Sequence, residues 1–326
     1  MQSVVGIDVS KEKIDIMLIC DHGQRHKVYT NDLSGYKQLQ HWLVLQQAGQ
    51  VHACLEATGQ YGDGIAEYLY EQGHLVSVVN PARIKRYGES KLHRNKTDKA
   101  DAALIAEFCM KEKTPYWKPL SPELKHLRAL VRRLSDLQTN YQQESNRLKS
   151  GEKDPQVLAD LADHLDYLNT RIKAIEKEIK EFIDQTPDLK SQKNLLISIP
   201  GIGNITAARL LAEIGDISAF EGAPQLAAYA GLNPKGFQSG SSVRKKTRIS
   251  KQGRSSLRCC LYLPAIVAMS HNPVIRSHCI RLSQRQLPKM AIVAASMRKL
   301  LHLVYGVLKN QLPFDPTYGA QFNFAS

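Results

Sequence analysis

The sequence has 326 residues, 43% of them hydrophobic, which suits two or three globular domains and excludes a disordered chain. The formal net charge is +13, and residues 186–326 hold the whole surplus, with 18 Lys and Arg against 5 Asp and Glu. This asymmetry indicates that the second half binds a polyanion, foremost nucleic acid, and the alternative is a solvated basic surface. No signal segment opens the chain, charges interrupt its longest apolar stretch, and its six cysteines have neither zinc nor disulfide spacings. We therefore expect an intracellular protein without a membrane span.

The first third of the chain has the pattern of an α/β domain. Apolar alternation and turn signals predict elements in the order β-β-β-α-β-α-β-α-α. The expected strands cover residues 4–10, 13–20, 25–30, 51–56 and 75–80. The expected helices cover 34–47, 62–72, a basic segment from residue 83, and a last helix that opens with residues 96–102. This order is typical of a mixed sheet with helices on its faces.

Four acids fall at the ends of these elements. Asp8 lies near the end of the first strand, Glu56 ends the fourth, and Asp98 and Asp101 share one face of the last helix. That face continues into apolar residues, so the last two carboxylates are expected to point inward, where unpaired charge is costly. Mg²⁺, which prefers hard carboxylate oxygens and substrate phosphates, would supply the missing charge. The plainer alternative makes each acid a turn residue or a helix cap.

This order of elements and acids resembles the ribonuclease H-like fold, and within it the RuvC-like branch of Holliday-junction resolvases, over about residues 1–115. The resemblance implies that Asp8, Glu56, Asp98 and Asp101 hold Mg²⁺ for a phosphoryl transfer. It leaves open whether one or two metal ions bind. We assign residues 1–118 to this catalytic domain.

Residues 119–186 have a helical pattern of a different kind. Apolar residues recur at spacings of three and four, which predicts a coiled-coil seam of more than three heptads. The seam consists of Leu158, Leu161, Leu165, Leu168, Ile172, Ile175, Ile179 and Phe182. A looser seam precedes it, and residues 151–155 separate the two. The pattern does not tell whether the partner helix belongs to the same chain or to another.

Residues 187–326 are expected to form a basic, mainly α-helical domain. It opens with two apolar helices around the turn Pro200-Gly201-Ile202-Gly203, the pattern of a helix-hairpin-helix. In that motif Gly201 and Gly203 would let backbone N–H groups approach a DNA phosphate. An ordinary helical turn is the alternative.

A basic stretch follows at residues 235–258, with eight Lys and Arg and no acid, and predicts contacts with a phosphate backbone. The residues expected to bind nucleic acid are Lys235, Arg244, Lys245, Lys246, Arg248, Lys251 and Arg254. Ser239, Ser241 and Ser242 lie in the same stretch, and a serine becomes a nucleophile only when its surroundings activate it. The local sequence does not choose among the three serines. A flexible polar loop that contacts DNA without chemistry is the alternative.

Together these motifs resemble the DEDD transposases of the "insertion sequence 110" family, the bridge-RNA-guided recombinases, over essentially the full length. The matching segments are 6–11, 56–59, 95–102, 200–203 and 239–244. The resemblance implies Mg²⁺ binding by the four acids and attack on a DNA phosphate by Ser239, through a covalent phosphoserine intermediate. It also implies a homo-oligomer, either dimer or tetramer, that acts on donor and target DNA with a structured bridge RNA. The expected location is the bacterial or archaeal cytoplasm, at the nucleoid.

Three other functions fit parts of the sequence. A Mg²⁺-dependent RuvC-like nuclease or junction resolvase would use the acids without serine chemistry. An actin-like ATPase or sugar kinase also begins with Ile-Asp after a strand, but a second glycine-rich phosphate loop is missing from the sequence. A binding module would leave the inward acids unexplained. The DNA sites and the guide RNA sequence are not readable from the protein, because base pairing would carry that specificity.

Overall fold

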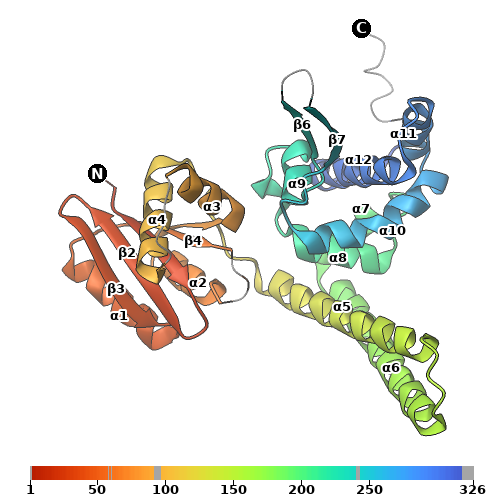
Figure 1. Cartoon of the computed structure of the whole chain (residues 1–326), viewed down its shortest axis with the longest axis horizontal. Coiled ribbons are helices and arrows are strands. Elements are labelled where there is room, and N and C mark those ends of the chain that lie inside the picture. The colour runs from red at the N-terminus through yellow and green to blue at the C-terminus, as the bar shows by residue number, and fades with distance from the viewer. Residues whose placement is uncertain (1, 58, 60, 92–96, 240–242, 318–326) are drawn as a thin grey trace. The chain divides into compact units, whose positions relative to one another are not determined.

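The computed structural model describes residues 2–57, 59, 61–91, 97–239 and 243–317, apart from the side chains of residues 237–246. The chain divides into two compact units, Met1–Pro119 and Leu120–Ser326 (Figure 1).

The first unit is a five-stranded sheet with helices on both faces. Its elements are β1 (Val4–Val9), β2 (Lys13–Cys20), β3 (Gly23–Thr30), α1 (Leu33–Leu45), β4 (His52–Glu56), α2 (Asp63–Glu71), β5 (Leu75–Val79), α3 (Pro81–Ser90) and α4 (Asp98–Lys111). The strand order is β3-β2-β1-β4-β5, with β1, β4 and β5 parallel and β2 antiparallel to both of its neighbours. The element order predicted from the sequence is confirmed.

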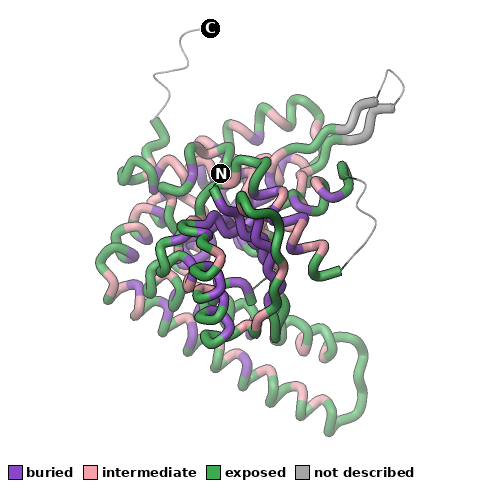
Figure 2. The backbone as a smooth tube through the Cα atoms, turned by 90° about the vertical axis from the view of Figure 1, so that its left-hand side faces the viewer, coloured by how far each residue is buried: buried purple, intermediate pink, exposed green. Residues whose placement is uncertain are grey.

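Alternation along each strand divides the buried residues of this unit between two faces of the sheet. One face packs against α1 and α2, where Ile7 and Leu55 join Leu39 and Leu69 in one cluster. The other face packs mainly against α4, in a cluster that includes Met17, Cys54, Ala102, Ile105 and Phe108. Figure 2 shows this central layer of buried backbone.

Gly6 lets α4 approach β1 at backbone distance. A Cβ atom at Gly6 would lie 2.2 Å from the carbonyl oxygen of Ala102 and 2.3 Å from the amide nitrogen of Ala106. No side chain fits in that space, and small residues line the helix where it crosses the strand. The close crossing places the first turn of α4 beside the carboxyl end of β1.

The second unit is mainly helical. Its elements are α5 (Pro122–Lys149), α6 (Pro155–Gln185), α7 (Pro187–Ile197), α8 (Asn204–Ile214), the 3₁₀ turn η1 (Ile217–Ala219), α9 (Ala223–Tyr229), β6 (Pro234–Ser239), β7 (Val243–Ile249), α10 (Ser255–His271), α11 (Pro273–Gln284) and α12 (Lys289–Asn310).

The two longest helices, α5 and α6, pack side by side as a hairpin within one chain (Figure 1). Asp154 caps α6 by accepting hydrogen bonds from the next two free amides, and Pro155 opens the helix without losing a bond. Leu134 on α5 and Leu168 and Ile175 on α6 are buried. The predicted seam therefore has a partner helix in its own chain, although the part of it nearest the turn is only half-buried.

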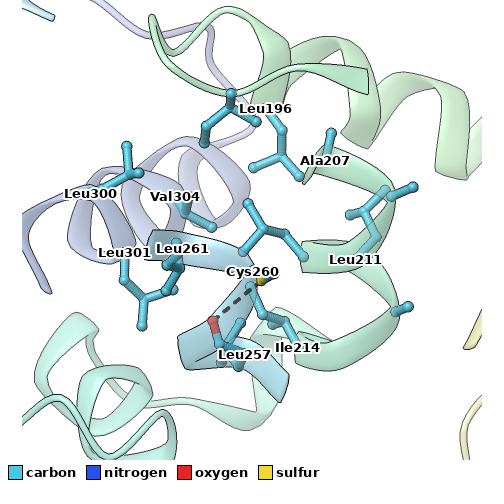
Figure 3. Packing of buried hydrophobic residues seen from close by; sticks show 14 of the residues in the cluster. Leu196, Ala207, Leu211, Ile214, Leu257, Cys260, Leu261, Leu300, Leu301 and Val304 are labelled. Carbon is cyan, nitrogen blue, oxygen red and sulfur yellow. Dashed lines mark hydrogen bonds between the residues drawn. The ribbon is translucent and has the colours of Figure 1, made fainter. Parts of the chain in front are cut away.

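Helices α7, α8, α10 and α12 enclose the core of the second unit. Leu196, Leu211, Leu261 and Leu301 meet there from the four helices (Figure 3). Among the described residues, α12 is the one helix long and apolar enough to pass as a membrane span. Its residues Leu300, Leu301 and Val304 are fully buried in this core.

Residues 234–239 and 243–249 form two paired strands, here called the hairpin, so these residues are not a loop. β6 and β7 pair antiparallel, and Ser239 pairs with Val243. Val243 and Thr247 of β7 are β-branched, which favours an extended backbone. Ser239 therefore lies on a regular strand.

Candidate active site

Asp8 and Glu56 lie on neighbouring parallel strands at the same edge of the sheet. Ile7 of β1 pairs with Leu55 of β4, and the two acids follow those residues directly. Cys54 faces α4, so alternation places Glu56 on the same face two residues later, and Gly6 and Asp8 are related in the same way. Both acids therefore emerge on the α4 side, at the carboxyl ends of the strands, where sheet enzymes hold their ligands.

The first turn of α4 brings two more acids to this edge. Thr97 caps the helix, its Oγ1 accepting a hydrogen bond of 3.2 Å from the amide of Ala100. Asp98 and Asp101 follow in the first turn, where the helix dipole favours negative charge. The Gly6 crossing fixes this turn against β1. We use the term acidic edge for Asp8, Asp15, Glu56, Asp98 and Asp101.

Electrostatics confirm that most of these carboxylates are close neighbours. Burial is the largest cause that raises the pKa of Asp8 from 3.8 to about 6, and the charges of Asp101, Asp98 and Asp15 raise it further, in that order. Lys13 acts in the opposite direction. Within the described part of the chain, no three His, Cys, Asp or Glu side chains form a ready-made metal-binding group. The edge is thus an open cluster of repelling charges.

Sequence reasoning missed Asp15, a member of this edge, and Lys13, the cation paired with it. Asp15 of β2 lies directly opposite Asp8, and its carboxylate is 6% exposed. Lys13 Nζ lies 2.6 Å from Oδ2 of Asp98 and 3.1 Å from Oδ2 of Asp15. The Asp98 side chain is 57% exposed, so the expectation that it points inward is wrong: it lies at the rim, in an ion pair. To predict either residue, one would have needed to know how β1 and β2 pair on either side of the turn at residues 10–13.

The basic stretch is divided between the hairpin and its base. Lys235, Arg248 and Lys251 are exposed. Ser239 ends β6, while Arg244, Lys245 and Lys246 lie in β7, and their backbone alone is described. Ser241 and Ser242 lie outside the described residues. All of these residues belong to the second unit.

Arg254 holds the base of the hairpin instead of lying on an open face. Its Nη1 lies 3.2 Å from Oε2 of the buried Glu213, and its guanidinium stacks 5.4 Å from the ring centre of Tyr229. Ser256 donates a 2.7 Å hydrogen bond to the same carboxylate oxygen. Arg258 donates to the carbonyl oxygens of residues 230 and 253. These contacts tie the segments on either side of the hairpin to α8, α9 and α10.

The two glycines of the α7–α8 turn differ in their surroundings. Gly201 has φ +107°, and a Cβ there would lie 2.7 Å from that of Ala268 on α10, so backbone conformation and packing both require glycine. Gly203 is exposed, with open space around its missing side chain. It precedes α8, whose N-terminus has no side-chain cap. Free amides are therefore available at this end of α8.

Comparisons with known proteins agree with this fold. A family model described as "Transposase", the DEDD type of the IS110 group, matches residues 5–151. A second, described as "Transposase IS116/IS110/IS902 family", matches residues 193–279. The chain belongs to this family of transposases, whose DEDD domain has the ribonuclease H-like fold, and it is therefore a DNA-recombining enzyme.

Its relatives include proteins that match from end to end. The pilin gene-inverting protein of Moraxella bovis is 34% identical over 317 residues, which cover 96% of this chain and 98% of the relative. A probable family 20 transposase of Pseudomonas aeruginosa is 24% identical over 96% of this chain and 99% of its own length. The insertion element IS110 protein of Streptomyces coelicolor is 28% identical over 47% of this chain and 37% of its own.

Proposed function

We propose that the protein cleaves and exchanges DNA strands with Mg²⁺ bound at the acidic edge and Ser239 as the nucleophile. The observation that carries this proposal is the Gly6 crossing, which brings Asp98 and Asp101 close enough to raise the pKa of Asp8. A half-buried Asp8 among other carboxylates would be a poor choice for stability alone, because burial and the neighbouring charges disfavour its ionised form.

Four carboxylates of the acidic edge suit Mg²⁺ in two ways: their oxygens are the right kind of ligand, and the site is open to solvent and substrate. Carboxylate oxygens are hard ligands, and Mg²⁺ is commonly held by one or two of them, with waters and substrate phosphates in the remaining positions. An open edge is therefore better suited to it than a closed protein cage. When bound, the metal would polarise the phosphate and stabilise charge on the attacking and leaving oxygens. Asp8, Glu56, Asp98 and Asp101 would hold it.

Ser239 would attack the phosphorus of a DNA phosphodiester. Its Oγ–H bond breaks, an Oγ–P bond forms, and the P–O bond to the leaving deoxyribose breaks, so that the leaving oxygen ends as a hydroxyl. A hydroxyl of the exchanged strand then attacks the phosphoserine and releases Ser239. The position of Ser239 at the end of β6 supports this role, since its backbone is paired with Val243 of β7.

The basic hairpin and the start of α8 would bind the phosphate backbone of DNA. Lys235 and Arg248 are exposed cations of the hairpin, and Lys251 is a third just after it. Three more cations lie in β7, namely Arg244, Lys245 and Lys246. Gly203 leaves the free amides of α8 open to a phosphate, as in a helix-hairpin-helix. We propose that a bridge RNA pairs with donor and target DNA, and that the α5–α6 coiled coil contributes to the assembly. The reaction would take place in the cytoplasm. The name of one relative, a pilin gene-inverting protein, suggests that inversion of a DNA segment would be one outcome of the reaction.

An exposed apolar stripe on α10 supports the proposal that the protein assembles into a homo-oligomer. Tyr262, Leu263, Ile266 and Val267 form an exposed apolar stripe at helical spacing, and Leu263 is 68% exposed. No Lys, Arg, Asp or Glu occurs between Arg258 and Arg276. Two chains with net charge +13 repel each other, so a neutral stripe is where a second copy can approach.

The experiment that tests the metal site compares DNA cleavage in four variants, Asp8→Asn, Glu56→Gln, Asp98→Asn and Asp101→Asn. We expect each to lose cleavage by about a hundredfold or more, because each removes charge stabilisation of the transition state. DNA binding should stay within about twofold, since the basic residues lie in the other unit. Asp163→Asn, on the exposed face of α6, serves as the control. Full cleavage in Asp8→Asn would refute the proposal.

A further inference from the structure

Lys13 forms a bridge between two elements of the acidic edge. It is the first residue of β2, and its ammonium lies 2.6 Å from Asp98 on α4 and 3.1 Å from Asp15 on its own strand. Asp15 is held a second time, by Nε2 of His26 at 3.0 Å. Asp98 is half-exposed and begins its helix, so its side chain can turn toward solvent or toward Asp8. One cation is thus already seated among the carboxylates that would hold another.

The location of Lys13 has a consequence for a divalent cation at the same edge. An ammonium a few ångströms away repels Mg²⁺, and Oδ2 of Asp98, which Lys13 contacts at 2.6 Å, is partly withdrawn from a metal. Without any cation, however, the charges of Asp8, Asp15, Asp98 and Asp101 repel each other, and α4 begins among them. Lys13 offsets that repulsion in the metal-free protein.

We propose that Lys13 is a positioning residue that serves as the counter-ion of the acidic edge before the metal binds, and that it releases Asp98 when a divalent cation arrives. Asp15, which is buried and also held by His26, keeps its contact with Lys13 throughout. The ion pairs of Lys13 keep the first turn of α4 in place when no metal is bound, and they lower the affinity of the edge for the metal. This inference rests on the proposed metal site.

An exposed ion pair without this role would behave differently. Ion pairs at the surface contribute little to stability, and their loss leaves ligand affinity unchanged. Lys13 is 47% exposed, so a purely peripheral role is the outcome to be excluded. The metal affinity distinguishes a peripheral ion pair from a counter-ion. Removing Lys13 raises the metal affinity only if Lys13 competes with the metal.

The test measures Mn²⁺ binding to the full-length protein by electron paramagnetic resonance of the free ion, with Lys13→Met, Lys13→Arg and Lys11→Met. Lys11 is an exposed lysine two residues away and serves as the charge-matched control. We expect Lys13→Met to bind Mn²⁺ about tenfold more tightly, because one nearby positive charge is gone. Lys13→Arg, which keeps the charge, should retain the wild-type affinity, and so should Lys11→Met. Equal or weaker binding in Lys13→Met, or tighter binding in Lys13→Arg, would overturn the inference.

A second readout follows the metal-free state. Both tryptophans, Trp42 and Trp117, belong to the first unit, so their fluorescence reports its unfolding. In the presence of a chelator, Lys13→Met should melt at a lower temperature than Lys11→Met. Added Mn²⁺ should raise the melting temperature of Lys13→Met by more than that of Lys11→Met. An unchanged melting temperature in the chelator would refute the counter-ion role. If Asp8→Asn binds Mn²⁺ as the wild type does, the metal site itself fails, and that result is distinct from a failure of the Lys13 inference alone.

Discussion

Asp8 is a half-buried carboxylate beside three others, so its ionised form destabilises the folded protein. Its folded pKa of about 6 exceeds the ordinary value of 3.8, chiefly because of burial and then because of Asp101, Asp98 and Asp15. The folded state therefore binds the Asp8 proton more tightly than the unfolded state does. The associated loss of stability is absent below pH 3.8, grows as the pH rises to about 6, and is complete above it.

Asp8→Asn should therefore stabilise the metal-free protein at pH 7.5 while it abolishes cleavage. The gain in melting temperature, followed by tryptophan fluorescence in a chelator, should shrink as the pH falls from 6 and approach zero below pH 3.8, where Asp8 is protonated in both states. Asp163→Asn on α6 should show no such pH dependence. An equal melting temperature for Asp8→Asn and the wild type at both pH values would mean that Asp8 is not strained by its neighbours.

The hairpin formed by β6 and β7 is the element through which we expect most phosphate contacts. Arg244→Gln together with Arg248→Gln should flatten the slope of log affinity against log salt by about 0.9 per lost contact, because each contact releases counterions. The matched control is Lys173→Gln together with Lys180→Gln, two exposed lysines of α6. If both pairs change the slope equally, the hairpin has no special place in DNA binding.

Helix α10 is the element that should join two copies. Cys259 lies on the exposed stripe, and four of the other five cysteines are buried. A bis-maleimide should therefore link two chains through Cys259, and Cys259→Ser should abolish the product. Leu263→Asp with Val267→Asp should remove both the product and the dimer measured by light scattering, while Ile280→Asp on α11 should keep them. A dimer that survives the double change on α10 would place the interface elsewhere.

At the scale of the whole molecule, sequence patterns predicted the first unit better than the second. Strand-end acids and short β–α spacings define the ribonuclease H-like order, and the structure bears it out from Val4 to Lys111. The Lys13 bridge was not predictable, because it depends on hairpin register and on how closely α4 crosses Gly6. The β6–β7 hairpin was missed because its strands include a Pro, a Gly and several Lys, residues that rarely indicate strands.

The basic residues illustrate the same limit. Arg254 belongs to a run of cations that suggests DNA contacts, yet it pairs with Glu213, an acid 41 residues earlier in the chain. Gly201 fits a phosphate-binding turn by pattern, but its packing on α10 already requires glycine. Composition identifies that a stretch is basic, and only the fold shows which cations remain exposed.

The central claim is that the acids and Ser239 act in one covalent reaction, and trapping the intermediate tests it most directly. End-labelled DNA is incubated with the protein and Mg²⁺, the protein is denatured, and label that stays on the chain is counted. We predict an adduct for the wild type, Ser241→Ala and Ser242→Ala, and none for Ser239→Ala or Asp8→Asn. Cleaved DNA with free ends and no adduct in the wild type would contradict the claim and favour a hydrolytic, resolvase-like nuclease, and an adduct that persists in Ser239→Ala would assign the nucleophile to another residue.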